Sequence, residues 1–335
     1  MTRVLFIGDI HIKFNNLDEV DKVISYIRKN VDTSRVDIAI LAGDILDTHG
    51  IVHTQLMNKA YELINSFTTN GVQTYVLIGN HDYIDNSQFC SENHWMAGVK
   101  KLGQNFTIVD SPIAIFDKTL VLVPYVPNGR FKEALNLHLD EDIWTNTKCI
   151  FAHQEFRGCK IGSIISETGD YWENSLPNVI SGHIHEKQRP QKNIYYPGSV
   201  INHSFGNDSQ GISIFTIESN DIEEECIPMD FQKKKIEYIT IEEIQNRFKQ
   251  DKLDLNTNFK YSLEGSQVEI AEFKKTTMYK TITKVCKVVF RERKVVDKRC
   301  KKGIVKNFTE ILYEKVVEDS SDKLIDDYKV ILSKM

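Results

Sequence analysis

The stretch Val4-Leu5-Phe6-Ile7-Gly8-Asp9-Ile10-His11 decides the fold, because it joins a buried strand to a pair of polar side chains. Its first four residues form a continuous apolar run, which is typical of a strand buried on both faces. Gly8 permits a tight turn where that strand ends. Asp9 and His11 are two positions apart, so an extended chain points both to the same side. The stretch therefore predicts a central strand whose carboxyl end carries an Asp and a His.

The same arrangement of an apolar run followed by polar residues recurs along the first two thirds of the chain. The runs and their polar residues are 38–41 before Gly43-Asp44, 75–78 before Gly79-Asn80-His81-Asp82, 149–151 before Ala152-His153, and 179–180 before Ser181-Gly182-His183-Ile184-His185. Further apolar runs lie at 120–123, 194–196 and 212–217. Segments with helical spacing alternate with the early runs, as at Val20, Val23, Ile24 and Ile27. This alternation predicts an α/β fold, a β-sandwich or layered sheet flanked by helices.

Every polar group follows the carboxyl end of a predicted strand, and in open α/β sheets these ends converge on one crevice where ligands bind. We therefore expect residues that are distant in sequence to meet there. Imidazoles combined with carboxylate or amide oxygens suit Mn, Fe or Zn better than Ca or an all-oxygen Mg site. The residue types predict two divalent transition-metal ions. Asp44 can bridge them, because one carboxylate reaches two cations ~3.5–4 Å apart.

Such a metal pair can bind phosphate oxygens and activate water, so the predicted reaction is hydrolysis of a phosphate ester. His81 lies between Asn80, a predicted ligand, and Asp82. An imidazole in this place can protonate the leaving oxygen or hydrogen-bond to the transition state. We assign His81 and Asp82 to catalysis, and we expect Asp82 to fix the orientation of the His81 ring.

The motifs D-x-H, G-D, G-N-H-D, a lone His and G-H-x-H resemble those of the calcineurin-like metallophosphoesterase superfamily. The resemblance covers the first two thirds of the chain. It implies His81 as the catalytic histidine and Mn²⁺ as the metal. It also implies that one metal is held by Asp9, His11, Asp44 and His185, and the other by Asp44, Asn80, His153 and His183. Some relatives have a second catalytic histidine where this chain has Asp47, and neither His49 nor His53 can be assumed to replace it.

Three stretches are most similar to SbcD-type DNA repair nucleases and their tailed-phage recombination relatives. They are residues 43–48, residues 153–156, and Tyr196-Pro197-Gly198-Ser199 together with Ser204-Phe205-Gly206. The likeness implies a 3′-to-5′ exonuclease and structure-dependent endonuclease that acts on DNA ends in repair or recombination. It also implies an SbcC-like coiled-coil ATPase as partner and a homodimer within that complex. Two alternatives remain: a phosphomonoesterase acting on proteins or nucleotides, and a non-catalytic DNA-end-binding subunit in which the metals are structural.

Beyond residue 225 the strand-to-ligand pattern stops, and lysine and arginine become dense. Residues 274–306 contain thirteen basic residues and two acidic ones. Composition alone fits either a solvated surface, in which Lys stems cover apolar neighbours, or a DNA-binding surface. The likeness to nucleases favours DNA, with Lys284, Lys287, Arg291 and Arg293 as the predicted contacts.

We predict three segments. Residues 1–225 form the phosphoesterase domain, and residues 226–306 form a smaller α+β domain that by resemblance caps the DNA. Residues 307–335 have apolar positions at helical spacing and predict C-terminal helices that belong to the cap or dock the partner. More than one domain is expected, because 335 residues exceed the ~250–300 at which a single core stops growing.

The composition bounds the class of protein further. A net charge of −5 excludes a wholly basic nucleic-acid coat, although it permits a local basic patch. No run approaches the ~20 apolar residues of a membrane span, so no membrane association is expected. The six cysteines lie far apart without a C-x-x-C pair, which predicts reduced thiols. The first residues lack a signal-peptide pattern, and we expect a cytoplasmic protein, in the host cytoplasm if it is viral.

Overall fold

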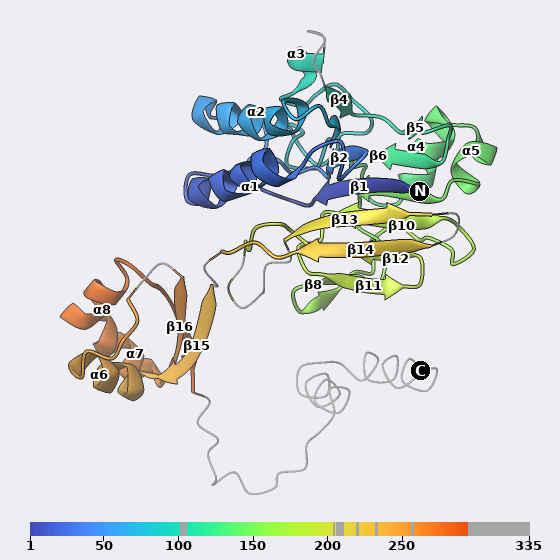
Figure 1. Cartoon of the computed structure of the whole chain (residues 1–335). Helices are drawn as coiled ribbons and strands as arrows, with labels where there is room; N and C mark the ends of the chain where they lie inside the picture. Colours follow the sequence, from blue (N-terminus) through green and yellow to red (C-terminus); the bar gives the residue numbers. More distant parts are fainter. Residues whose placement is uncertain are drawn as a thin grey trace, which may run out of the picture.

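The computed structural model describes residues 1–100, 106–203, 205, 211–218, 221–231, 234–255 and 258–293. Two six-stranded sheets form its largest part, with strand orders β14-β13-β1-β2-β3-β4 and β11-β12-β10-β7-β6-β5 (Figure 1). The first sheet contains β1 (Thr2–Ile7), β2 (Ile38–Leu41), β3 (Gln73–Leu77), β4 (Phe106–Val109), β13 (Ile212–Ile217) and β14 (Ile222–Ile227). The second contains β5 (Ile113–Ile115), β6 (Leu120–Val123), β7 (Cys149–His153), β10 (Asn178–Gly182), β11 (Gln188–Gln191) and β12 (Ile194–Tyr196).

The centre of each sheet is parallel. Strands β1 to β4 pair in parallel in the first sheet, as do β6, β7, β10 and β12 in the second. Parallel pairing places the carboxyl ends of neighbouring strands at one edge of a sheet. The predicted α/β sandwich is confirmed, and each predicted apolar run lies in or overlaps a strand.

Apolar side chains fill the space between the two sheets. Within β1, Val4 and Phe6 face this inner layer, whereas Leu5 and Ile7 face the helices on the other side. The rings of Phe6, Phe151 and Phe215 meet in the inner layer, with centroids 6.0–6.1 Å apart. Because both faces of β1 are covered, the strand reads as a continuous apolar run.

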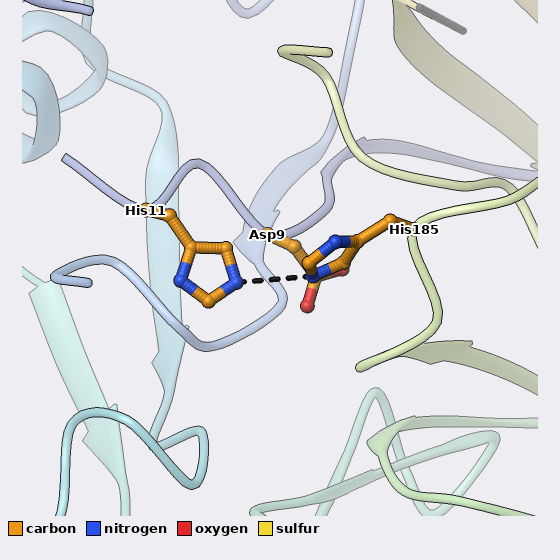
Figure 2. A group of neighbouring side chains, drawn as sticks. All are labelled: Asp9, His11 and His185. Carbon is orange, nitrogen blue, oxygen red and sulfur yellow. Dashed lines mark hydrogen bonds between the residues drawn. The ribbon is translucent and has the colours of Figure 1, made fainter. Parts of the chain in front are cut away.

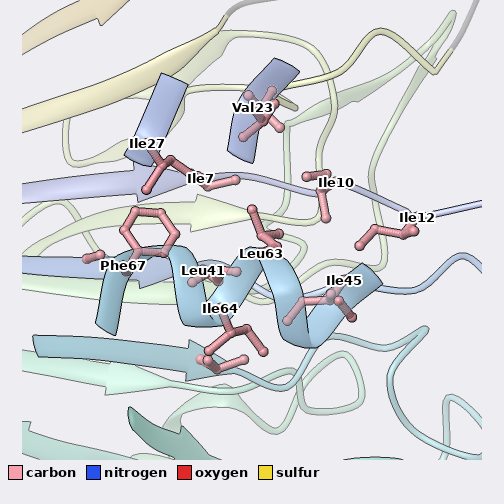
Figure 3. Close-up of a cluster of buried hydrophobic side chains, with 14 of the residues drawn as sticks. Ile7, Ile10, Ile12, Val23, Ile27, Leu41, Ile45, Leu63, Ile64 and Phe67 are labelled. Carbon is pink, nitrogen blue, oxygen red and sulfur yellow. The ribbon is translucent and has the colours of Figure 1, made fainter. Parts of the chain in front are cut away.

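Helices α1 (Leu17–Asn30) and α2 (Thr54–Thr68) cover the outer face of the first sheet. Figure 3 shows Val23 and Ile27 of α1, and Leu63 of α2, in the cluster that contains Ile7 and Leu41. Shorter helices are α3 (Ala97–Lys100), α4 (Phe131–His138) and α5 (Glu141–Thr145). The last two contribute to the outer core of the second sheet, and β8 (Lys160–Ile161) and β9 (Ile164–Ile165) form a small hairpin.

The basic segment begins with a separate three-stranded sheet of β15 (Lys235–Thr240), β16 (Phe259–Gly265) and β17 (Lys287–Glu292). Its helices are α6 (Ile241–Lys249), α7 (Gln267–Lys274) and α8 (Thr277–Ile282). Capping boxes begin α6 and α7 directly after β15 and β16. The three strands pair in parallel and alternate with the helices. This is an α/β arrangement, whereas an α+β domain was expected. We call residues 235–292 the C-terminal module.

The module has its own core, which includes Tyr261, Leu263 and Phe273. The predicted boundary at residue 225 lies inside β14, and the next strand begins at Lys235. The predicted helices of residues 307–335 lie outside the described residues. Within the described part, no helix has both the length and the apolarity of a membrane span.

Candidate metal centre

Loops from both sheets meet at one edge of the sandwich and bring the predicted ligands together. Asp9 and His11 follow β1, Asp44 follows β2, Asn80 follows β3, His153 ends β7, and His183 and His185 follow β10. His153 and Gly182 are register partners in neighbouring parallel strands, which places the two histidine-bearing chain segments of the second sheet side by side. The parallel topology thus gathers residues that are up to 176 positions apart, from Asp9 to His185.

The backbone of these loops is left-handed at four of the predicted ligands. The φ angles are 35° at Asp9, 42° at His11, 50° at Asp44 and 76° at His183. For residues other than glycine this conformation costs ~1–2 kcal/mol each, and it is found where the surroundings enforce it. Here hydrogen bonds join the loops: the His11 amide donates to the Asp44 carbonyl (2.9 Å), and the His183 amide to Asp9 Oδ1 (2.8 Å). The strain is localised where the side chains converge.

The first ligand group consists of Asp9, His11 and His185. Their ligand atoms lie within 4.8 Å of one another. The Nε2 atoms of His11 and His185 are 3.1 Å apart, and the carboxylate of Asp9 lies beside them (Figure 2). His11 Nε2 is also 3.5 Å from Asp44 Oδ2.

The second ligand group consists of Asp44, His153 and His183, with Asn80 among them. Asn80 Oδ1 lies 3.1 Å from His153 Nε2 and 2.9 Å from His183 Nδ1. The amide nitrogen of Asn80 donates to Asn86 Oδ1 (3.4 Å), which keeps its oxygen turned toward the histidines.

Asp44 faces both groups. Its Oδ2 is near His11, whereas its Oδ1 lies 3.4 Å from His153 Nε2 and accepts a hydrogen bond from the His81 amide (2.8 Å). Burial disfavours the ionised carboxylate, but His153 and His11 outweigh burial and hold the pKa of Asp44 below its usual range. The structure thus places one buried, ionised carboxylate between the two groups, as a bridging ligand requires.

The second group has the polarity of a cation site. His153 Nδ1–H donates to the carbonyl of Ala42 (2.6 Å), so Nε2 of the neutral ring carries a lone pair and is an acceptor. That lone pair faces the acceptor oxygens of Asn80 and Asp44. Burial lowers the pKa of His153, but the Asp44 carboxylate outweighs burial and raises this pKa to about 9. The position therefore attracts positive charge, which a proton or a metal ion can supply.

The first group fits a metal ion for the same reason. Burial raises the pKa of Asp9 to about 7, and Asp9 Oδ2 is buried without a hydrogen-bond partner among the described residues. Burial also lowers the pKa of His185 to about 4 and that of His11 well below its usual value. Neutral imidazole is the form that binds metals. The two groups therefore fit two divalent cations, and mixed nitrogen and oxygen donors suit a transition metal.

His81 lies beside the first group and contacts Asp47, His11 and His49. Its Nδ1–H donates to the Asp47 carbonyl (2.9 Å), and its ring packs edge-on against His11. The ring of His49 stacks on it at 4.5 Å. His53 lies further out, where it caps α2 and contacts Phe14.

The structure corrects the predicted role of Asp82. Its buried carboxylate accepts hydrogen bonds from the amides of Ile45 (3.1 Å) and Gly79 (3.0 Å) and from the Trp95 indole (2.9 Å). These donors occupy it, so the Asp47 carbonyl orients the His81 ring instead. Asp82 fixes the backbone of the Asp44 and Asn80 loops, because it joins them.

Two residues near the site were missed in the sequence. His203 packs against His11 and His185, with ring centroids 4.9 and 5.1 Å away. Glu155 Oε2 lies 3.9 Å from His183 Nε2. Glu155 lies within residues 153–156, and His203 directly precedes Ser204-Phe205-Gly206; both stretches resemble those of nucleases. This position in the sequence was the available signal.

The four predicted DNA contacts lie in the C-terminal module or at its end. Lys287 and Arg291 are exposed on one face of β17. Arg291 and Arg293 lie 3.9 and 3.4 Å from the carboxylate of Glu264, and Lys284 follows α8. Both arginines therefore have an acidic neighbour, Glu264.

A groove of about 780 Å³ lies between the sandwich and this module, and His203 is the residue that it shares with the surroundings of the metal centre. His203 and Lys13 line it on the side of the site, and Lys234, Asn258 and Lys287 line it on the side of the module. Lys22 is a fourth lysine, and Asp18 and Glu19 are the acidic residues. Four lysines and two acidic residues therefore line the groove.

Two groups of His, Asp and Asn ligands at the strand ends of a sandwich are typical of a metal-dependent phosphoesterase. The family described as "Calcineurin-like phosphoesterase" matches residues 2–187. The chain belongs to this family, whose members use a dinuclear metal centre to hydrolyse phosphoesters.

Two viral proteins are similar over most of the chain. "Putative phosphoesterase 244L" of Invertebrate iridescent virus 6 is 50% identical over 222 residues, which are 66% of this chain and 77% of that protein. "Putative phosphoesterase 078R" of Invertebrate iridescent virus 3 is 40% identical over 282 residues, 83% of this chain and 81% of that protein. A hypothetical protein from Thermus thermophilus is a distant structural likeness, with a TM-score of 0.36 and 13% identity over 68% of this chain and 99% of that one.

Proposed function

We propose that this phosphoesterase is a DNA nuclease that hydrolyses phosphodiester bonds at DNA ends. The observation that carries the proposal is the groove beside His203, between the sandwich and the C-terminal module, which four lysines and two acidic residues line. A small phosphomonoester, such as a nucleotide, would not extend along such a groove. A DNA strand continues beyond the bond that is cut, and lysines along its path would neutralise its phosphates.

The ligand geometry indicates which residues would hold each metal. One ion would be held by Asp9, His11, Asp44 and His185, and the other by Asp44, Asn80, His153 and His183. When bound, the pair would supply Lewis-acid polarisation of the phosphate and lower the pKa of water. Mn²⁺ is our proposal for the physiological ion, because the mixed donor set favours a transition metal.

His81 is the proposed proton donor. The Asp47 carbonyl accepts from Nδ1–H, which leaves Nε2 to carry the second proton of the imidazolium. The stacked ring of His49 and the edge contact with His11 hold the ring in one plane. A proton at Nε2 is then available to the leaving oxygen of the cut phosphodiester.

The proposal includes partners. DNA is the substrate, and an SbcC-like ATPase would control access to it, with two copies of the nuclease in the complex. Residues 307–335 are the proposed docking segment. A chain that lacks them should lose binding to the ATPase in a pull-down, and unchanged binding would remove this segment from the proposal. We place this activity in the cytoplasm, of the host if the chain is viral.

A substrate panel tests the proposal. End-labelled single-stranded and duplex DNA, a phosphoserine peptide, and p-nitrophenyl phosphate would be incubated with the Mn²⁺-loaded full chain. We expect cleavage of DNA and little hydrolysis of the two monoesters. Hydrolysis of the monoesters beside intact DNA would assign the site to phosphomonoesterase chemistry. Binding of DNA without any hydrolysis would favour the non-catalytic alternative.

A further inference from the structure

We propose that His203 is a positioning residue of the metal centre, which holds the strained Asp9–His11 loop in its ligating conformation. The inference concerns the metal site and does not depend on whether DNA is the substrate. His203 lies 16 residues beyond the end of the segment that matches the family, so the match itself assigns it no role.

The segment that ends at His203 connects two ligand loops. The Ser199 amide donates to the carbonyl of His185 (3.1 Å), and the Val200 amide donates to the carbonyl of Gly8 (3.0 Å). Gly8 and Gly198 approach so closely that a Cβ on Gly8 would lie 2.5 Å from the Gly198 carbonyl oxygen. The segment therefore contacts the loops after β1 and β10, which together supply the first ligand group.

His203 adds a side-chain hydrogen bond to this connection. A carbonyl can only accept, so Nε2–H of His203 donates to the Asp9 carbonyl (2.7 Å). Asp9 and His11 both have left-handed backbone, and the peptide that follows Asp9 lies between them. A hydrogen bond to that peptide's oxygen restricts its rotation. The ring thereby sets the direction of both flanking ligands without being a ligand itself.

The unpartnered atoms of the site point to the same arrangement. Among the described residues, five buried side-chain nitrogen or oxygen atoms lack a hydrogen-bond partner, and three of them belong to Asp9, His11 and His203. Two of these atoms belong to predicted ligands of the first group, and the ring of His203 packs against His11. His203 uses Nε2 for the Asp9 carbonyl, and its Nδ1 has no hydrogen-bond partner among the described residues.

Substitutions can separate the two ring nitrogens. In His203→Gln the amide N–H reaches about as far as Nε2, whereas in His203→Asn it reaches only about as far as Nδ1. His203→Ala removes both. Loss of a residue that orients metal ligands typically weakens metal affinity about 10- to 100-fold. We therefore expect weaker Mn²⁺ binding in the Ala and Asn variants and recovery in the Gln variant.

Calorimetric titration of the metal-free full chain with Mn²⁺ measures this directly, without reference to activity. His94→Gln is the matched control, because His94 is also buried, with Nε2 3.3 Å from Asp110 and Nδ1 unpartnered, and does not contact the ligand groups. The control should bind Mn²⁺ like the wild type. Wild-type affinity in His203→Ala, or equal recovery by Asn and Gln, would overturn the proposal. If the Ala variant does not fold, the difference between Gln and Asn decides.

Discussion

Single residues in this protein adopt backbone conformations that side chains rarely take, and they do so at the metal ligands. Asp9, His11, Asp44 and His183 are all left-handed, and none is a glycine. Strain of this kind persists only when neighbouring contacts enforce it. The hydrogen bonds from His183 and His203 to Asp9 are such contacts. The geometry of the site therefore depends on contacts between the loops, and one of them comes from His203, which lies outside both ligand groups.

Gly79 shows how closely the loops approach. A Cβ at this position would lie 2.2 Å from the Asp44 amide nitrogen and 2.3 Å from its Oδ1. We expect Gly79→Ala to displace the Asp44 carboxylate, to destabilise the fold by ~1–3 kcal/mol, and to weaken Mn²⁺ binding. Urea unfolding and Mn²⁺ titration would measure the two effects.

Gly98→Ala is the control for this change. Among the described residues, no heavy atom outside the helix's own backbone and the neighbouring residues lies within 4 Å of a Cβ at Gly98 in helix α3. The substitution should therefore be neutral or stabilising by up to ~1 kcal/mol. If Gly79→Ala binds Mn²⁺ as tightly as Gly98→Ala does, the close approach to Asp44 does not matter for the site.

His81 and His49 differ in the role that we assign to them. Removing a general acid typically lowers the rate ~10²–10⁴-fold, so His81→Ala should cause a loss of that size. The loss should be smaller on bis(p-nitrophenyl) phosphate, whose leaving group departs without needing a proton. His49→Ala removes only a stacked neighbour and should have a smaller effect on both substrates. Equal losses on both substrates in His81→Ala would contradict proton donation.

For single residues, the sequence indicates which residue types form the metal site and approximately how they are grouped. The predicted ligands lie in the two predicted groups because each follows a strand that the apolar pattern identifies. Neither the left-handed backbone nor the position of His203 could be inferred, since both depend on contacts between loops distant in sequence. The role of Asp82 was mistaken because adjacency in the chain suggested contact with His81, whereas the turn directs its carboxylate to backbone amides.

Among the strands and helices, the continuous apolar runs were sufficient to predict the central strands. Edge strands such as β11 (QRPQ) and β14 (IEEECI) were not predicted, because one exposed face interrupts the apolar run. The division into two sheets was not predictable from local patterns either, since pairing between β1 and β13 joins residues more than 200 positions apart. In the C-terminal module, the capping residues Thr240 and Ser266 were the signals of alternating helices.

The end of β4 offers a test of stability against pH. Asp110, which follows β4, accepts hydrogen bonds from Lys100 Nζ of α3 (2.7 and 2.8 Å) and lies 3.3 Å from His94 Nε2. Burial raises the pKa of Asp110, but the bonds to His94 and Lys100 outweigh it and lower the pKa below the usual value. A lowered folded-state pKa stabilises the fold above the unfolded pKa, and that contribution is lost as the pH falls through the folded pKa.

Asp110→Asn should therefore cost ~1–3 kcal/mol of unfolding free energy near neutral pH. The difference from the wild type should shrink as the pH falls below ~4, where the unfolded carboxyl takes up a proton. Urea unfolding of both proteins at several pH values measures it. A difference that stays constant with pH would mean that the charge of Asp110 does not stabilise the fold.

For the whole molecule, the groove between the sandwich and the C-terminal module is the proposed path of the DNA. Lys287 lines this groove from β17 and is exposed. Lys287→Gln should raise the KM for DNA and leave hydrolysis of bis(p-nitrophenyl) phosphate unchanged. Each lost phosphate contact should also reduce the slope of log affinity against log salt concentration by ~0.9 for duplex DNA.

Lys148→Gln is the matched control, because Lys148 precedes β7 and lies at the opposite end of that strand from His153. It should leave both the KM for DNA and the salt slope as they are in the wild type. If Lys287→Gln and Lys148→Gln behave alike, the groove does not carry the DNA. The hydrolytic site would then remain, and the substrate would have to be sought elsewhere.

The most direct test of the central claim is cleavage of end-labelled DNA by the full chain, with Mn²⁺ or with a chelator. The wild type would be measured beside Asp44→Ala, which removes the proposed bridge, and His81→Ala, which removes the proposed acid. We predict Mn²⁺-dependent cleavage that the chelator abolishes and that both variants lose. Cleavage that survives the chelator or the Asp44→Ala substitution, or DNA that stays intact with every metal tried, would contradict a two-metal nuclease.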